Sequence, residues 1–281
     1  MKKLTDTGRS GYSAERRPEE RSTPLMTADD HRLARDLAAQ TGQRLLALRA
    51  EGGDPDSLRA AGDRLAHEYL MAELTRLRPG DAVLSEEGQD DQARLSAERA
   101  WIVDPLDGTR EFGEAGRTDW AVHVALWEQG GLTAGAVDLP ARQETLSTAE
   151  PSAPPAAGPP GADADGDGDG LRIVISRSRP PAFIERVAEL TGAELVPLGS
   201  AGAKVAAVVR GEVDAYVHAG GQYEWDSAAP VAVARASGLH ASRIDGSELT
   251  YNQARPWMPD LLVCRPELAG VLLDAIGSAS R

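Results

Sequence analysis

Residues 100–109 read Ala-Trp-Ile-Val-Asp-Pro-Leu-Asp-Gly-Thr, and the expected fold is built outward from this stretch. The apolar run 100–103 predicts a short buried strand ending at Asp104, because Pro105 removes a backbone donor and fixes its own φ. Asp104 and Asp107 then lie at the exit of the strand. Carboxylate oxygens are hard ligands of the kind that Mg²⁺ prefers, together with water and phosphate. The stretch therefore predicts a site where a divalent cation meets a phosphate.

Gly108 and Thr109 support the same interpretation. Glycine lets a phosphate approach the backbone closely, and a helix beginning near Thr109 would point its unpaired N–H groups at that anion. The alternative is an Asp-Gly turn followed by an N-capping threonine, which binds nothing. The hexapeptide 104–109 alone leaves both interpretations open.

Two further acidic segments lie at the ends of expected elements. Glu86 and Glu87 follow the apolar strand residues Val83-Leu84, and Asp226 lies in Glu-Trp-Asp-Ser-Ala-Ala-Pro (224–230), ahead of an Ala/Val-rich helix. Acids at strand ends converge when their strands lie side by side. Each segment also has a plain structural explanation, a solvated turn for Glu86-Glu87 and a helix N-cap for Asp226.

Together, the three motifs in this order resemble the lithium-sensitive, magnesium-dependent phosphatases of the inositol monophosphatase superfamily. The longer forms Asp-Pro-Leu-Asp-Gly-Thr-Arg-Glu-Phe (104–112) and Gly-Gly-Gln-Tyr-Glu-Trp-Asp (220–226) are most similar to the bacterial CysQ-type bisphosphate nucleotidases, which are 3′-phosphoadenosine-5′-phosphate phosphatases. The resemblance covers roughly residues 27–276. It implies a layered αβαβα sugar-phosphatase fold of the α/β (α+β) class, and a homodimer.

The resemblance also implies roles for single residues. Two or three Mg²⁺ ions per site would be held by the side chains of Glu86, Asp104, Asp107 and Asp226 and by the carbonyl of Leu106. Glu86 and Asp104 would bridge ions, and Glu87 would support the ligands from behind. Thr109 would act with an aspartate of an earlier helix to orient the attacking water. Asp63 is the matching aspartate, although its lead-in Arg-Ala-Ala-Gly (59–62) departs from the pattern of the family.

Substrate contacts are expected from the metal motif and from a second loop. The candidates are Gly108, Thr109, Arg110, Gly199, Ser200 and Asp226. Gly199 and Ser200 lie between an expected strand and helix, where Ser200 is alternatively a plain N-cap. A second phosphate would require a bidentate arginine, either Arg110 or one of Arg177 and Arg179, whose alternative role is ordinary surface charge.

The implied reaction is hydrolysis of the 3′-phosphate of adenosine 3′,5′-bisphosphate, and also of 3′-phosphoadenylyl sulfate, in sulfur assimilation. Phosphoryl transfer needs positioning and cations more than a nucleophilic side chain, so in-line attack by metal-activated water is expected. Inositol 1-phosphate and fructose 1,6-bisphosphate are alternative substrates. A catalytically inactive metal- or nucleotide-binding regulatory protein is the alternative from another class.

The resemblance implies a small-molecule phosphomonoester as the binding partner, and the composition argues against polyanionic partners. The chain has 281 residues and a formal charge of −14, which argues against nucleic acid or anionic membrane as partners, since both are polyanions. No apolar run approaches ~18 residues, and the charged N-terminus lacks a secretory signal, so a cytoplasmic location is expected. Cys264 is the single cysteine, which excludes an intrachain disulfide and is typical of a small core residue.

Four segments are expected along the chain. Residues 1–24 read as a disordered tail, 25–149 as an N-terminal α+β half with the metal motifs, 150–170 as a disordered Pro/Gly/Asp loop, and 171–281 as a C-terminal α/β half. Helices are expected from Thr27, over 63–77, 182–191 and 201–210, and from Asp226. Strands are expected at 82–85, 100–104, 120–127, 132–138, 171–176, 195–198 and 213–218, with another apolar strand-like run at 260–264.

Overall fold

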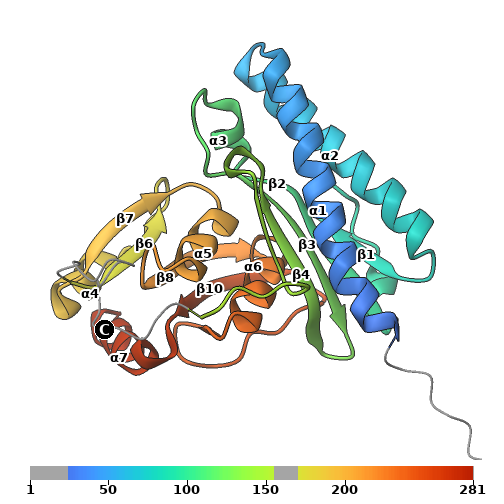
Figure 1. The fold of residues 1–281 in the computed structure, drawn as a ribbon. Helices are drawn as coiled ribbons and strands as arrows, with labels where there is room; N and C mark the ends of the chain where they lie inside the picture. Colours follow the sequence, from blue (N-terminus) through green and yellow to red (C-terminus); the bar gives the residue numbers. More distant parts are fainter. Residues whose placement is uncertain (1–24, 155–169, 281) are drawn as a thin grey trace, which may run out of the picture.

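The computed structural model describes residues 25–154 and 170–280, and shows five stacked layers of helices and sheets (Figure 1). Helices α1 and α2 form the outer layer on one side, followed by a five-stranded sheet, helices α5 and α6, a second five-stranded sheet, and helices α4 and α7. The predicted layered αβαβα fold is therefore confirmed. The predicted disorder of residues 1–24 and of most of 150–170 concerns residues outside the described ranges, apart from Glu150–Pro154 and Gly170.

The outer helices are longer than predicted. Helix α1 spans Leu25–Glu51 and α2 spans Pro55–Leu77, so the prediction that the second helix begins near Asp63 was wrong by eight residues. Asp54 caps α2 by accepting a hydrogen bond from Ser57 N at 3.0 Å, and Pro55 occupies the first helical position, where its missing N–H has no cost. The early start places Asp63 two turns inside the helix, facing the sheet end that carries the metal motif.

The first sheet has the strand order β1-β2-β3-β4-β5. Its strands are β1 Ala82–Ser85, β2 Arg99–Asp107, β3 Ala121–Glu128, β4 Gly131–Leu139 and β5 Glu144–Ser147. Only β1 and β2 are parallel, with Ser85 opposite Val103. Because parallel strands end at the same edge of a sheet, Glu86 and Asp104 emerge beside each other.

Strand β2 does not stop at Pro105 as predicted. Its pairing with β3 is interrupted after Asp104 and resumes where Asp107 pairs with Ala121, so the proline lies in a local irregularity of a longer strand. Gly108 follows with φ 85°, and helix α3 begins at Thr109 and ends at Gly113. The irregularity lets both aspartates leave the strand near one point.

The second sheet has the order β7-β6-β8-β10-β9, with β7, β6 and β8 parallel. Its elements and the helices around it are β6 Arg172–Ser176, α4 Ile184–Thr191, β7 Glu194–Leu198, α5 Ala201–Val209, β8 Ala215–Tyr223, α6 Glu224–Ala236, β9 His240–Ser242, β10 Trp257–Cys264 and α7 Ala269–Ala279. Strand β8 runs five residues beyond the predicted end at His218. Every residue of α5 is buried, because this helix lies between the two sheets.

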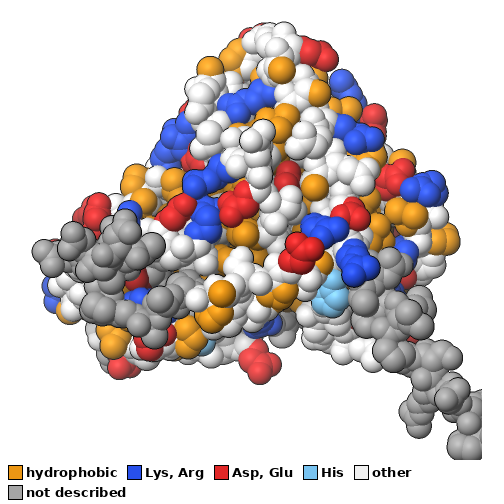
Figure 2. Space-filling view, in the orientation of Figure 1, with side chains coloured by type: hydrophobic (Ala, Val, Ile, Leu, Met, Phe, Trp, Pro, Cys, Tyr) orange, Lys and Arg blue, Asp and Glu red, His pale blue; other side chains and the backbone are white. Residues whose placement is uncertain are grey.

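Cys264 is fully buried, as expected of a core residue. In the part of the chain that the structure describes, no helix is both long and apolar enough to cross a bilayer. Figure 2 shows acidic and basic side chains interspersed over one face rather than a continuous basic surface.

Asp138 of β4 makes stability depend on pH. Its side chain is buried against Gly42 of α1, Oδ1 accepts a hydrogen bond from Thr145 at 2.6 Å, and Oδ2 has no partner among the described residues. Burial raises the pKa of Asp138 to about 6, and the Thr145 hydrogen bond opposes this. When the pKa of a carboxyl group is higher in the folded protein than in the unfolded chain, the protein loses stability as the pH rises from the lower pKa to the higher one.

The free energy of unfolding of the wild type should fall by roughly 2–3 kcal/mol as the pH rises from 4 to about 7. We expect Asp138→Asn to abolish this fall. Urea unfolding at several pH values measures this, with the exposed Asp274→Asn of α7 as a control. Identical pH dependence of unfolding in the wild type and Asp138→Asn would contradict the assignment.

Candidate active site

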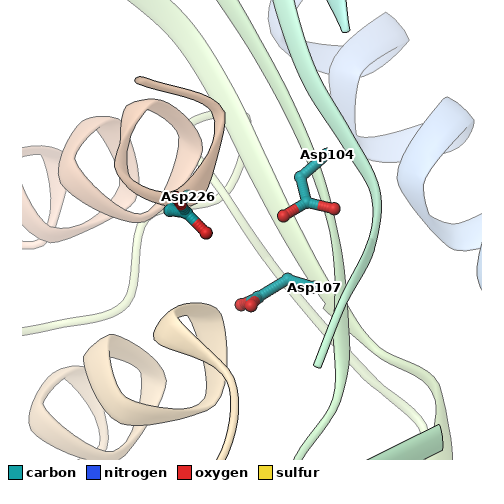
Figure 3. Close-up of side chains that lie close together, drawn as sticks. All are labelled: Asp104, Asp107 and Asp226. Atoms are coloured by element: carbon teal, nitrogen blue, oxygen red, sulfur yellow. The ribbon is translucent and has the colours of Figure 1, made fainter. Parts of the chain in front are cut away.

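Three carboxylates gather between the first sheet and α6. Oxygens of Asp104, Asp107 and Asp226 all lie within 4.8 Å of one another, and Figure 3 shows the side chains directed toward a common space. Two come from the end of β2 and one from the first turn of α6, 119 residues after Asp107 in the sequence (226 − 107). Such a set of hard oxygen donors can hold a divalent cation.

The backbone at the start of α6 holds Asp226 in place. The N-cap of this helix is Tyr223, and Asp226 is the third helical residue, so the interpretation of Asp226 as the N-cap was wrong. Asp226 Oδ2 nevertheless accepts a hydrogen bond from Tyr223 N at 2.6 Å, which satisfies a donor at the helix N-terminus. This contact fixes the orientation of the carboxylate toward β2.

Asp107 has an imidazole and a backbone N–H as neighbours. Gly202 N donates to its Oδ2 at 2.7 Å, and His123 Nε2 lies 3.2 Å from the same oxygen. Burial alone would raise the pKa of Asp107, but His123, Lys204 and the Gly202 N–H together lower it. His123 Nδ1 also contacts the Trp225 carbonyl at 3.1 Å, so this histidine connects β2 to α6.

The pKa values of Asp104 and Glu86 are raised, in contrast to that of Asp107. Burial, followed by the charge of Glu86 and then those of Asp107 and Asp226, raises the pKa of Asp104 well above its usual value. Burial and the charge of Asp226 raise the pKa of Glu86 to about 7. Carboxyl groups that resist ionisation because they are desolvated and crowded are stabilised by a bound cation. The donor set and its electrostatics therefore fit a site for divalent metal.

Thr109 contacts the predicted partner from α2. Its Oγ1 lies 3.2 Å from Asp63 Oδ1 and 3.1 Å from the Leu106 carbonyl, so its proton is donated to one of these acceptors. Burial raises the pKa of Asp63 to about 6, the charge of Glu87 adds to this effect, and the Thr109 hydrogen bond opposes it. The two side chains meet although 46 residues separate them.

A cavity of about 390 Å³ opens beside the carboxylates. The predicted site residues that line it are Glu86, Asp104, Leu106, Asp107, Gly108, Thr109, Arg110, Gly199, Ser200 and Asp226. Asp63, Glu87 and Arg177 do not line the cavity, and Asp63 reaches the site through Thr109. Ser200 caps α5, since its Oγ accepts from Ala203 N at 2.8 Å, as its alternative interpretation predicted.

Lys204 of α5 is a cavity residue that the sequence interpretation missed. It is 3% exposed, and its amino group donates to the carbonyls of Gly199 and Ser200. Burial lowers its pKa to about 8, although Asp107 and Asp226 oppose this effect. The signal in the sequence was a lone lysine within the otherwise uncharged residues 201–209.

The three candidate arginines for the second phosphate differ in their surroundings. Arg177 donates to Glu111 at 2.6 Å and to Glu114 at 3.2 Å, whereas Arg110 and Arg179 line the main cavity. Arg179 also lines a second cavity of about 380 Å³, together with Pro180, Pro181, Ala182, Phe183, His218, Ala219, Gly220 and Gly221. The two cavities share Arg179 and His218, so they are neighbours.

A buried arginine connects the loop after Glu86 to the helix that carries Asp226. Arg94 is 1% exposed and donates to Asp90 at 2.7 Å, to Asn252 Oδ1 at 2.7 Å and to the Gln253 carbonyl at 2.9 Å. Glu224, the first residue of α6, accepts from the backbone N–H groups of Asn252 and Gln253 at 2.6 and 2.8 Å. These contacts fix the position of the loop after Glu86 relative to the start of α6.

We expect Arg94→Leu to lower the free energy of unfolding by about 2–4 kcal/mol, because it leaves buried acceptors without a donor. Urea denaturation measures the change. The matched control is Arg76→Leu, which removes an exposed ion pair with Glu73 and should cost less than about 1 kcal/mol. Equal effects of the two substitutions would contradict the expected role of Arg94.

Comparisons with known proteins show which sequences and folds this chain resembles. The sequence model of the inositol monophosphatase family matches residues 30–278. The 3′-phosphoadenosine 5′-phosphate phosphatase of Mycobacterium leprae (strain TN) is 51% identical over 258 residues, which are 88% of this chain and 93% of the relative. The 3′(2′),5′-bisphosphate nucleotidase CysQ of Escherichia coli K12 is 33% identical over 204 residues, 68% of this chain and 78% of the relative.

Solved structures share the fold as well. The crystal structure of CysQ from Bacteroides thetaiotaomicron, a bacterial member of the inositol monophosphatase family, superimposes with a TM-score of 0.70 at 27% identity. The match covers 86% of this chain and 99% of that one. On the extent of the family match and the identity to these relatives, the chain belongs to the inositol monophosphatase family.

Proposed function

We propose that this protein is a phosphoric monoester hydrolase that removes the 3′-phosphate of adenosine 3′,5′-bisphosphate in a Mg²⁺-dependent reaction. The observation that carries the proposal is the meeting of Asp104, Asp107 and Asp226 beside the Thr109–Asp63 pair at one cavity. The names of relatives more than half identical to this chain support the choice of substrate. Hydrolysis of 3′-phosphoadenylyl sulfate is the natural extension of this proposal.

The metal would be held by Glu86, Asp104, Asp107, Asp226 and the Leu106 carbonyl, with two or three ions per site. When bound, Mg²⁺ would neutralise phosphate charge and make a nearby water more acidic. The chain itself supplies the positioning. Thr109 and Asp63 lie where a hydroxyl and a carboxylate can orient water and accept its proton, and Lys204 adds a buried positive charge near the aspartates.

The preference for a bisphosphate rests on the part of the cavity away from the carboxylates. Arg179 faces both cavities and can bind a second phosphate, whereas Arg177 is engaged by Glu111 and Glu114. Inositol 1-phosphate has no second phosphate to use this arginine, and fructose 1,6-bisphosphate has no base to fill the second cavity. The alternative of a catalytically inactive regulatory protein is disfavoured because the expected acids and the Thr109–Asp63 contact are all present.

Phosphate release from the three substrates tests this proposal, measured with Mg²⁺ in the presence and absence of millimolar lithium. We expect adenosine 3′,5′-bisphosphate to give the highest kcat/KM, inhibition by lithium, and transfer of ¹⁸O from labelled water into the released phosphate. Preference for inositol 1-phosphate would overturn the substrate assignment, and activity on none of the three would favour the regulatory alternative. The expected homodimer is tested by light scattering during size-exclusion chromatography.

A further inference from the structure

His218 of β8 lies at the junction of the two cavities and has no role in the chemistry described above. Its side chain lines both the main cavity and the second cavity, although the residue is only 6% exposed. Tyr216 and Gln222 of the same strand also line the main cavity. A substrate that extends from the carboxylates into the second cavity must pass this imidazole.

One ring nitrogen of His218 has a fixed partner. Nε2 lies 3.1 Å from the carbonyl oxygen of Gly221. Because a carbonyl oxygen only accepts hydrogen bonds, Nε2 must carry the proton. Gly220 and Gly221 have φ values of 101° and 92°, where a side chain would be strained, and the pairing of β8 with β10 is irregular at this point. The irregular backbone thus turns a carbonyl toward the ring and selects one tautomer.

The other ring nitrogen is an unpaired acceptor. Nδ1 is buried and has no hydrogen-bond partner among the described residues. Burial lowers the pKa of His218, and the positive charges of Lys204 and Arg179 lower it further, against the opposing effects of Gly221 and Asp260. The ring is therefore neutral near pH 7, with a lone pair on Nδ1. Leaving a buried acceptor unpaired is costly, so a ligand with a donor at this point is favoured.

We infer that His218 Nδ1 accepts a hydrogen bond from a donor on the nucleoside of the substrate, either a ribose hydroxyl or the exocyclic amino group of the base. The inference rests on the proposed function and specifies how that site recognises a nucleoside. Pro180, Pro181 and Phe183 give the second cavity apolar walls that suit a base, and the ribose would lie at the junction.

A contact between His218 and the second phosphate is disfavoured by the same tautomer. An ionised phosphate offers acceptors, and a neutral Nδ1 is also an acceptor, so the two repel. Arg179 lines the same cavities, and a guanidinium offers the donors that a phosphate needs. The two residues thus divide recognition between phosphate and nucleoside.

The test compares four substrates, which are adenosine 3′,5′-bisphosphate, its 2′-deoxy analogue, inosine 3′,5′-bisphosphate and adenosine 3′-monophosphate. In the wild type, kcat/KM should fall about tenfold for either the 2′-deoxy analogue or the inosine analogue, and the affected analogue identifies the donor. His218→Ala should lower kcat/KM for adenosine 3′,5′-bisphosphate by a similar factor and remove the discrimination. His218→Asn keeps an acceptor near the position of Nδ1, so it should restore most of the lost kcat/KM and most of the discrimination between substrates.

The matched control is His240→Ala, which removes a histidine from β9, separated from β8 by β10 in the same sheet, and should leave kcat/KM unchanged. Equal wild-type rates on the first three substrates would overturn the inference without any variant. An equal loss on all four substrates in His218→Ala would indicate a structural role, and a loss confined to substrates with a 5′-phosphate would indicate phosphate binding. Both results overturn it. Hydrolysis of inositol 1-phosphate but of no nucleotide would overturn the proposed function as well.

Discussion

Replacing Asp104 with asparagine is expected to lower kcat roughly a thousandfold while the protein remains folded. The amide keeps the volume of the side chain and can still accept the hydrogen bond from Leu106 N, which is 3.0 Å from Asp104 Oδ1. It removes a negative charge that the neighbouring acids disfavour. We therefore also expect the variant to unfold at a higher temperature than the wild type when a chelator is present, and to gain less stability from added Mg²⁺.

Phosphate release and thermal unfolding with and without Mg²⁺ measure these effects. Asp138→Asn is the matched control, since it is also a buried acid-to-amide change but lies outside the cavity, and its kcat should equal that of the wild type. Normal turnover by Asp104→Asn, together with an unchanged response to Mg²⁺, would disprove the proposed metal site.

Asp63→Asn and Thr109→Ala are each expected to lower kcat about 10²–10⁴-fold with little change in KM. Both residues are proposed to orient the same water, so neither contributes to catalysis when the other is absent. The double variant should therefore be no more than a few times slower than the slower single variant, because residues that act as a unit are not additive.

Steady-state kinetics of the four proteins provide this double-mutant cycle. Thr109→Ser keeps the hydroxyl and should retain most of the activity, which separates the hydroxyl from the packing of the methyl group. Losses that simply multiply would show that Asp63 and Thr109 act independently, contrary to the proposal.

Much of the fold follows from local patterns in the sequence. The apolar run 82–84 and the run 100–103 predict two strands, because such short runs bury best within a sheet. The alternation of strand and helix after residue 171 predicts the second sheet with its helices. Boundaries were less accurate where a cap or an irregularity decides them. The early start of α2 depends on Asp54 and Pro55, and the continuation of β2 past Pro105 depends on renewed pairing at Asp107.

The sequence by itself determined which acids were candidates for one site, since Asp104, Asp107, Glu86 and Asp226 stand in motifs at the ends of expected elements. The tertiary structure decided which other side chains lie beside them. Lys204, His123 and His218 belong to no motif, and long-range packing of α5, β3 and β8 brings them to the carboxylates or the cavities. Burial lowers the pKa values of Lys204 and His218 and neighbouring charges modify them, and both effects are properties of the folded chain rather than of local sequence.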